Sequence, residues 1–242
     1  MKLIVKVLIS LLCCFILMES KIYKFKTPKI ILFGDSEFEY SFSGGLGTQL
    51  TIKYGSKADI INRGLSGYNT NRGLEALNDL ITLKDYFVSE KENSANNLVI
   101  VMFGDNDCSI ESQHVDVEKY IKNLHTIITN IRDLGSNYDI ILMTPVPIND
   151  ILWKEDCEKS GRPVDRYNKD LIMYREAMIR TAETLNVHLI DIWGDSWNST
   201  LMYTDGLHPT TLGYTFIAER LYDYLKSNLP NWHYENLPHP RR

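Results

Sequence analysis

The sequence predicts an α/β fold, a flavodoxin-like three-layer sandwich around a five-stranded parallel sheet in the order 2-1-3-4-5. Short apolar runs that suit buried strands alternate with segments whose apolar residues recur at helical spacing. The run from Leu98 to Phe103 contains no polar residue, which is typical of a central parallel strand covered on both faces. Right-handed crossovers between five such strands then favour the stated order.

Five strands are expected, over residues 29–33, 58–62, 98–103, 139–144 and 187–192. One helix is expected to begin near residue 46. Further helices are expected over residues 74–81, 117–131, 171–185 and 210–225, where apolar residues are three or four positions apart. Residues 148–165 form a long connection without a clear pattern. We find no internal repeat and no boundary after residue 28. The sequence therefore predicts one domain over residues 29–228 and an irregular tail over 229–242, which holds three prolines.

Composition excludes some classes of protein. The chain has 242 residues, of which 44% are hydrophobic and 24% are charged, enough for one α/β domain with a full core. Its net charge is -5, and it has no block of like charge. Nothing in this pattern suggests that nucleic acid is a partner, and no feature of the sequence sets the oligomeric state.

The N-terminal segment, residues 1–20, is predicted to be a signal peptide. Lys2 and Lys6 precede an apolar stretch from Val7 to Met18, which is short for a transmembrane helix. Met18 lies where a signal peptidase prefers a small residue. An uncleaved N-terminal anchor is the alternative, and it would be the expected link to a membrane. The protein is accordingly expected in the secretory pathway or outside the cell, or anchored to a membrane by this segment.

The cysteines outside that segment do not form a disulfide framework. Cys108 and Cys157 could pair in an oxidising compartment, but the sequence does not place them near each other. A glycosylation sequon begins at Asn198, which matters only if the chain is secreted by a eukaryote.

Polar and glycine residues with possible chemical roles follow four of the predicted strands. Because the carboxyl ends of parallel strands meet at one edge of a sheet, segments that are distant in the sequence are expected to meet there. These residues are Ser36, Gly67, Asn106, Asp205 and His208.

This set of residue types suits acyl transfer. A serine such as Ser36 is a weak nucleophile and needs a base such as His208 beside it. Asp205, three residues before His208, can hold the imidazole in one tautomer. The backbone N–H groups of Ser36 and Gly67 and the side-chain amide of Asn106 can bind a developing oxyanion.

Simpler interpretations exist for each motif. Residues 205–209 could be a turn before the last helix, with Thr210 as its N-cap, and Gly67 could be a turn glycine. Residues 104–107 could be a turn or a cation site, but no His, Asp or Glu cluster has ligand spacing, so no metal is expected. Ser196 repeats the Gly-Asp-Ser tripeptide and is rejected as the nucleophile because it would leave the other segments without roles. Asp191 is a weaker rival to Asp205.

Four sequence blocks resemble those of the SGNH, or GDSL-type, hydrolases in order and spacing. They are Phe33-Gly34-Asp35-Ser36, the run from Asn62 to Thr70, Gly104-Asp105-Asn106-Asp107 and Asp205-Gly206-Leu207-His208-Pro209. Within the superfamily, the run from Asn62 to Thr70 is most similar to the isoamyl acetate-hydrolysing esterase branch. Thr144-Pro145-Val146-Pro147 and the connection from Trp153 to Cys157 are similar to it too.

The resemblance implies a serine esterase of small acyl esters that needs no cofactor and works through an acyl-Ser36 intermediate. His208 would be the base, Asp205 the acid, and Ser36, Gly67 and Asn106 the oxyanion donors. A carbohydrate O-acetylesterase, a lysophospholipase-like hydrolase and a non-catalytic ligand-binding protein are alternatives. A metal-dependent hydrolase that uses Asp105, Asp107 and His208 is a further one.

Two residues depart from the family pattern. Glu37 follows Ser36, where the family usually has an apolar residue, and Asp105 replaces a small or neutral residue before Asn106. The Glu37 carboxylate could raise the pKa of His208, narrow the range of substrates, or face solvent. Two added acids at the rim are expected to disfavour anionic substrates.

Overall fold

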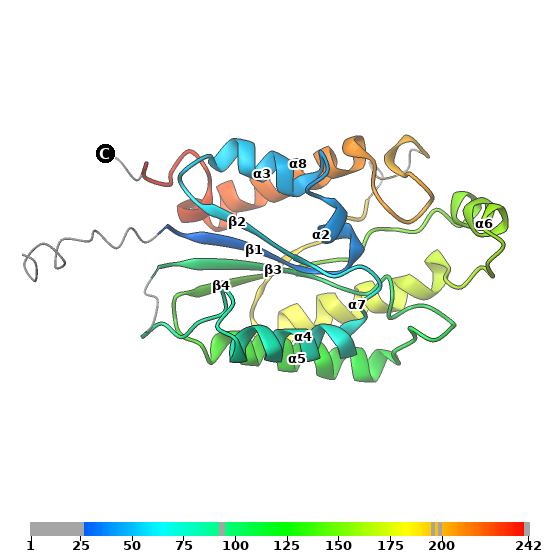
Figure 1. Cartoon of the computed structure of the whole chain (residues 1–242), viewed down its shortest axis with the longest axis horizontal. Coiled ribbons are helices and arrows are strands. Elements are labelled where there is room, and N and C mark those ends of the chain that lie inside the picture. Colours follow the sequence, from blue (N-terminus) through cyan, green and yellow to red (C-terminus); the bar gives the residue numbers. More distant parts are fainter. Residues whose placement is uncertain (1–26, 92–94, 195–196, 198–199, 240–242) are drawn as a thin grey trace, which may run out of the picture.

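A five-stranded parallel sheet in the order β2-β1-β3-β4-β5 forms the middle layer of the computed structural model (Figure 1). The structure describes residues 27–91, 95–194, 197 and 200–239. The signal-peptide segment, Ser196 and the sequon asparagine Asn198 lie outside the described residues. The predicted fold and strand order are confirmed. The strands are β1 (Lys29–Gly34), β2 (Asp59–Gly64), β3 (Asn97–Met102), β4 (Tyr138–Met143) and β5 (His188–Ile190).

Helices cover both faces of the sheet, as Figure 1 shows. One face carries α2 (Ser36–Tyr40), α3 (Leu46–Tyr54) and α8 (Thr211–Asn228). The other carries α4 (Thr70–Thr82), α5 (Val117–Arg132) and α7 (Asn168–Leu185). Helix α6 (Asp150–Lys159) lies beyond the carboxyl ends of the strands, near α2 and the rim. Within the described part of the chain, no helix combines the length and apolar character needed to cross a membrane.

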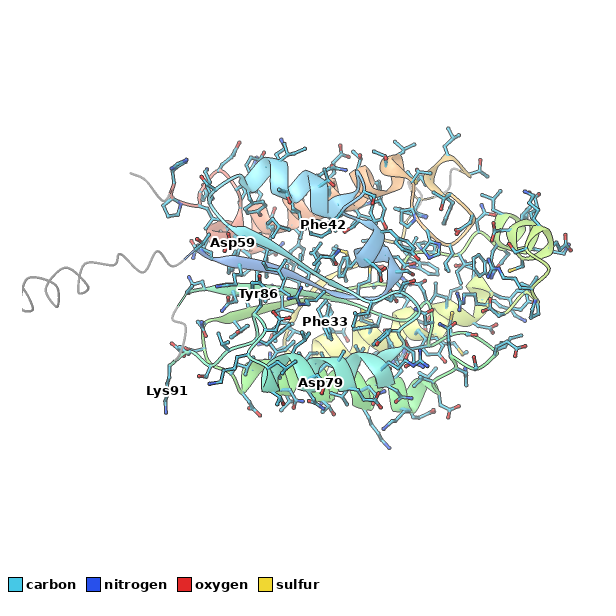
Figure 2. The ribbon with its side chains drawn as sticks, viewed as in Figure 1. Phe33, Phe42, Asp59, Asp79, Tyr86 and Lys91 are labelled. Atoms are coloured by element: carbon cyan, nitrogen blue, oxygen red, sulfur yellow. The ribbon has the colours of Figure 1, made fainter. Side chains whose placement is uncertain are left out.

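The side chains of each central strand alternate between two cores. Ile31 and Phe33 of β1 pack in the core beside α4, α5 and α7, whereas Ile30 and Leu32 pack in the core beside α3 and α8. Figure 2 shows Phe33 on the α4 side of the sheet. This alternation follows from the two-residue period of a strand, and it explains why β1 and β3 are apolar throughout.

Helices α2 and α6 do not appear among the elements expected from the sequence. Helix α2 has five residues, too few for a periodic pattern. Helix α6 lies inside the connection of residues 148–165 and buries only Trp153 and Cys157, so its apolar signal is weak. Its start is fixed by the Asn149 side chain, which accepts a hydrogen bond from the Leu152 N–H at 3.1 Å.

The tail after α8 packs on the domain. A short 3₁₀ helix, Pro230–Trp232, is followed by turns. The Trp232 side chain is buried, its indole N–H donates to Asp139 at 2.6 Å, and its carbonyl accepts from the Tyr54 hydroxyl at 2.6 Å. The segment therefore has little regular structure but fixed contacts. Cys108 and Cys157 are both buried free thiols.

Candidate active site

Ser36 lies at the carboxyl end of β1, as the first residue of α2. Helix α2 packs closely against β2, and glycine permits this approach. A Cβ atom on Gly64 would lie 2.0 Å from the Glu39 backbone nitrogen. The first N–H groups of a helix have no acceptor within the helix, so the Ser36 N–H makes no hydrogen bond within α2. The Ser36 side chain is therefore placed on a rigid corner at the rim.

Ser36, His208 and Asp205 form one hydrogen-bonded series. The Ser36 Oγ atom lies 3.0 Å from His208 Nε2, and His208 Nδ1 lies 2.6 Å from Asp205 Oδ2. The other Asp205 oxygen accepts from the backbone N–H groups of Leu207 at 2.9 Å and His208 at 2.8 Å. The structure thus brings together the three residues that the sequence analysis selected from opposite ends of the chain.

Electrostatics favour an ionised Asp205. Burial would raise the pKa of Asp205, but hydrogen bonds from His208 and Leu207 and the charge of His208 hold it below its usual range. Burial lowers the pKa of His208, but the hydrogen bond to Asp205 and the negative charges of Glu37 and Asp205 outweigh it and raise that pKa. Because an ionised carboxylate only accepts, the His208 proton lies on Nδ1 and leaves Nε2 free to accept from Ser36.

The loop that carries Asp205 and His208 is anchored at both sides. The Gly206 carbonyl accepts from the Asn149 N–H at 2.8 Å, next to the start of α6. Gly206 has a φ of 99°, and a Cβ atom there would lie 2.3 Å from the Trp153 nitrogen. The Tyr40 ring contacts the His208 ring edge-to-face, with the two ring centroids 5.2 Å apart. These contacts fix the imidazole beside Ser36, and α6 therefore belongs to the support of the site.

The predicted oxyanion donors Gly67 and Asn106 lie together in the neighbouring loops. Gly67 has a φ of 77°, a left-handed conformation that favours glycine. The Asn106 amide donates to the Tyr68 carbonyl at 3.0 Å. The loop before Gly67 is joined to the end of β1 by the Leu65 N–H, which donates to the Gly34 carbonyl at 2.9 Å. One Asn106 N–H is thus engaged, and an amide nitrogen carries a second.

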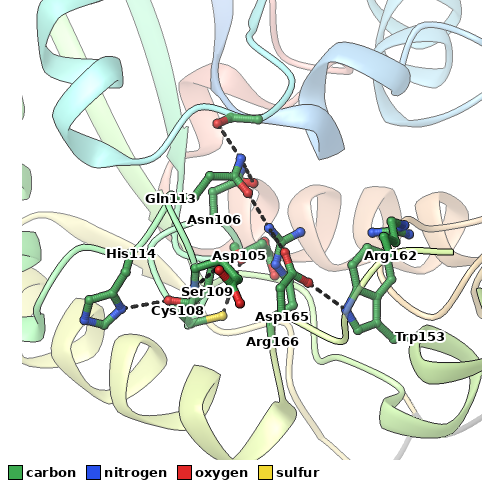
Figure 3. Close-up of polar contacts among 12 residues, drawn as sticks. Asp105, Asn106, Cys108, Ser109, Gln113, His114, Trp153, Arg162, Asp165 and Arg166 are labelled. Atoms are coloured by element: carbon green, nitrogen blue, oxygen red, sulfur yellow. Dashed lines mark hydrogen bonds and ion pairs between the residues drawn. The ribbon is translucent and has the colours of Figure 1, made fainter. Parts of the chain in front are cut away.

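Gln113 and Arg166 hold Gly67 and Asn106 in place, and no sequence motif identifies either of them. Gln113 Nε2 donates to the Gly67 carbonyl at 2.8 Å and to Asn106 Oδ1 at 3.0 Å. The Arg166 guanidinium donates to Gln113 Oε1 at 2.5 Å and pairs with Asp165 at 3.1 Å. Figure 3 shows this connected series, which fixes which atom of the Asn106 side chain is the donor.

A second group of carboxylates lies on the other side of Ser36. Asp35, Glu37 and Asp105 are 0%, 0% and 1% exposed, and one oxygen atom of each lies within 4.8 Å of one oxygen atom of the other two. The option that Glu37 faces solvent is therefore wrong. Burial raises the pKa of Asp35 and of Asp105 well above the usual range, and the negative charge of Glu37 adds to both shifts.

The other acids considered from the sequence have different partners. Asp107 accepts from the Thr70 N–H at 3.0 Å and from the Thr70 hydroxyl at 2.5 Å, and burial raises its pKa to about 7. Asp191 pairs with Arg175 and accepts from Thr144 at 3.1 Å. Among the described residues, Asp105, Asp107 and His208 do not form a group that could share a metal ion. The described part of the chain therefore does not form the metal site of the alternative metal-dependent hydrolase.

Comparisons with known proteins show the family and the fold that this chain shares. The model of the GDSL-like Lipase/Acylhydrolase family matches residues 32–216. The human isoamyl acetate-hydrolyzing esterase 1 homolog is 32% identical over 218 residues, with 84% of each chain covered. The rice GDSL esterase/lipase WDL1 is 32% identical over 210 residues, covering 82% of this chain and 78% of its own. The crystal structure of the acetyl xylan esterase AlAXEase matches with a TM-score of 0.63 at 18% identity, covering 81% of this chain and 99% of its own.

Proposed function

Because the chain belongs to the GDSL-like lipase/acylhydrolase family, we propose that it is a serine esterase that hydrolyses small acyl esters of the acetyl type. One observation carries the proposal. Ser36 Oγ, His208 and Asp205 are joined at 3.0 and 2.6 Å, in the order that nucleophilic catalysis by serine requires. The relatives named as esterases support the reaction class.

The reaction begins with attack of Ser36 Oγ on the ester carbonyl carbon. His208 Nε2 takes the hydroxyl proton, and Asp205 stabilises the imidazolium that forms. The tetrahedral intermediate collapses, and His208 returns the proton to the departing alcohol. Water then attacks the acyl-Ser36 ester with His208 as the base again, and the carboxylic acid leaves. These steps consume only ester and water, so the proposal needs no cofactor.

The negative charge on the carbonyl oxygen is stabilised by three donors. They are the Ser36 N–H, the Gly67 N–H and the free N–H of the Asn106 amide. No described residue accepts a hydrogen bond from the Gly67 N–H. Gln113 holds Gly67 and Asn106 through two hydrogen bonds, so these donors are positioned before the substrate binds.

A profile of ester hydrolysis tests the substrate class. The full chain is assayed against nitrophenyl esters of increasing acyl length, against acetates of small alcohols, and against acetylated sugars, with Ser36→Ala as the control. We expect the highest kcat/KM with acetyl or other short acyl groups, and loss of at least about 10⁴-fold in the variant. A preference for long acyl chains, or for acetylated sugars over simple acetates, would reject the small-ester assignment.

We also propose that residues 1–20 direct the chain into the secretory pathway, on the strength of Lys2, Lys6 and the apolar stretch that follows. Sequencing the N-terminus of the protein produced in a secreting eukaryotic cell tests this. Cleavage near Ser20 is expected. A chain that keeps the segment and fractionates with membranes would support the anchor instead.

A further inference from the structure

Three buried acids beside Ser36 have almost no hydrogen-bond donors. Both oxygens of Asp35, both oxygens of Asp105 and one oxygen of Glu37 are buried without a partner among the described residues. The second Glu37 oxygen lies 3.3 Å from Ser36 Oγ. Buried polar groups in native proteins are normally satisfied, and buried charges are paired or bind a metal. These oxygens therefore need a positive partner.

Among the described residues, the guanidinium of Arg166 lies near the cluster but does not neutralise it. Arg166 is close enough to Asp105 to oppose the upward shift of its pKa, but burial and the charge of Glu37 outweigh it. Its Nη2 group bonds to Gln113 and Asp165, and its buried Nε has no partner among the described residues. A proton held between two carboxyl groups, or a small cation, remains as the means of neutralising the group.

The spacing of the carboxylate oxygens fits a cation. Oxygen ligands of Ca²⁺ lie about 2.3–2.6 Å from the ion, so two ligands of one ion are at most about 5 Å apart. The three carboxylates each offer one oxygen within 4.8 Å of the others. An all-oxygen, all-carboxylate set selects hard divalent ions over softer metals such as copper. The three side chains follow the carboxyl ends of β1 and β3, which are neighbouring strands, so the fold brings them together.

We propose that Asp35, Glu37 and Asp105 bind one hard divalent cation of the Mg²⁺ or Ca²⁺ class beside Ser36. Glu37 and Asp105 lie far apart in the sequence and meet in this one cluster. Without a shared cation, the carboxylate of Glu37 or of Asp105 would be a buried charge without a partner. Together with Asp35 they complete a set of three carboxylate ligands, which gives these buried acids one shared explanation.

Metal binding is measured on the full chain, independently of esterase activity. The protein is stripped with EDTA and dialysed against Ca²⁺ alone or Mg²⁺ alone, and bound metal is counted by mass spectrometry. We expect one ion per chain for at least one of the two metals, and less than a tenth of that in Glu37→Gln and in Asp105→Asn. The matched control is Glu39→Gln, because Glu39 lies on the same helix but is exposed and outside the cluster, and it should keep the ion.

Thermal unfolding provides the second measurement. At an ion concentration about one hundred times the dissociation constant, the Tm of the wild type should rise by about 5–10 °C. The Tm of the two cluster variants should not respond to the metal. In EDTA both variants should unfold at a higher temperature than the wild type, since each removes a buried acid without a partner.

Two results would overturn the proposal. One is failure of folded wild type to bind either metal at millimolar concentration, which would mean that shared protons neutralise the cluster. The other is binding that survives in both Glu37→Gln and Asp105→Asn, which would place the ion elsewhere. Neither result depends on whether the chain hydrolyses esters, so this proposal and the proposed esterase activity fail separately.

Discussion

Two groups of carboxylates flank Ser36, and they have opposite surroundings. Asp205 receives three hydrogen bonds, from the His208 ring and from two backbone N–H groups, and its pKa is held below the usual range. Within the described part of the chain, the side-chain oxygens of Asp35 and Asp105 are buried without a partner at normal hydrogen-bond geometry, and burial raises the pKa of both. All of these acids are at least partly buried. Donors, rather than burial alone, decide whether a carboxylate at this rim is ionised.

The comparison separates two kinds of acidic residue that look alike in the sequence. Asp205 is supplied with its donors by the turn that carries it, so it can orient His208 without outside help. Among the described residues, the cluster of Asp35, Glu37 and Asp105 has one side-chain donor, the Ser36 hydroxyl at 3.3 Å from Glu37, and a proton or a metal ion would neutralise the remaining oxygens. The following variants change one side of this comparison at a time, beginning with the largest expected effect.

The Asp205→Asn variant replaces the ionised carboxylate beside His208 by a neutral amide. An amide cannot stabilise the imidazolium and favours the wrong tautomer of His208, so kcat/KM for an acetyl ester should fall about 10⁴-fold. The matched control is Asp191→Asn, because Asp191 was the rival candidate but pairs with Arg175. The control should stay within about threefold of the wild type. Equal losses in both variants would contradict the assignment of Asp205.

The Asn106→Ala variant removes one oxyanion donor and leaves both groups of carboxylates intact. Loss of one such donor costs about 10²–10³-fold in kcat, with a much smaller change in KM, because the bond strengthens in the transition state. Steady-state kinetics with a short acyl ester measure this split. An unchanged kcat would show that Asn106 only supports the Tyr68 loop, to which its amide also donates.

The Gln113→Ala variant tests whether Asn106 and Gly67 need to be held. Gln113 is not one of the proposed catalytic or oxyanion-binding residues, but its side chain donates hydrogen bonds to the Gly67 carbonyl and to Asn106 Oδ1. Small misplacement of a catalytic group costs roughly ten- to a hundredfold, so kcat should fall by that amount while KM changes little. In a double-mutant cycle with Asn106→Ala, the two losses should not add. Full additivity would mean that Gln113 acts on something other than Asn106.

The smallest expected effect is a shift in the pH profile of Glu37→Gln. His208 must be neutral to accept the Ser36 proton, so activity falls as the pH drops through the pKa of His208. The Glu37 charge is one cause that raises this pKa. Removing it should move the acid limb of kcat/KM to lower pH, measured in EDTA so that no metal screens the charge. A limb that stays in place or moves to higher pH would disprove this coupling.

The sequence predicted the fold and the central contacts for one physical reason. Parallel strands bring their carboxyl ends to one edge, so Ser36 and the loop of Asp205 and His208 could be placed together from the strand pattern alone. The side on which Glu37 would lie could not be predicted. Its burial depends on how the short helix α2 packs against β2 and on the side chain of Asp105, and neither leaves a periodic signal.

Supporting residues were also beyond the reach of sequence patterns. Gln113 and Arg166 lie in irregular segments and act through contacts with distant loops, so no spacing rule identifies them. Helix α6, which anchors Gly206 through Asn149, buries only two residues and resembles a loop in composition. An Asn four residues before the buried Trp153 was the available hint of its N-terminal cap.

Covalent labelling tests the proposed role of Ser36 most directly. The full chain is treated with a fluorophosphonate, and the adduct is located by intact mass and peptide mapping. We predict one adduct, on Ser36, that is absent in Ser36→Ala and forms far more slowly in His208→Ala, because Ser36 then lacks its base. An adduct on a different residue, or no adduct on folded wild type, would contradict the account.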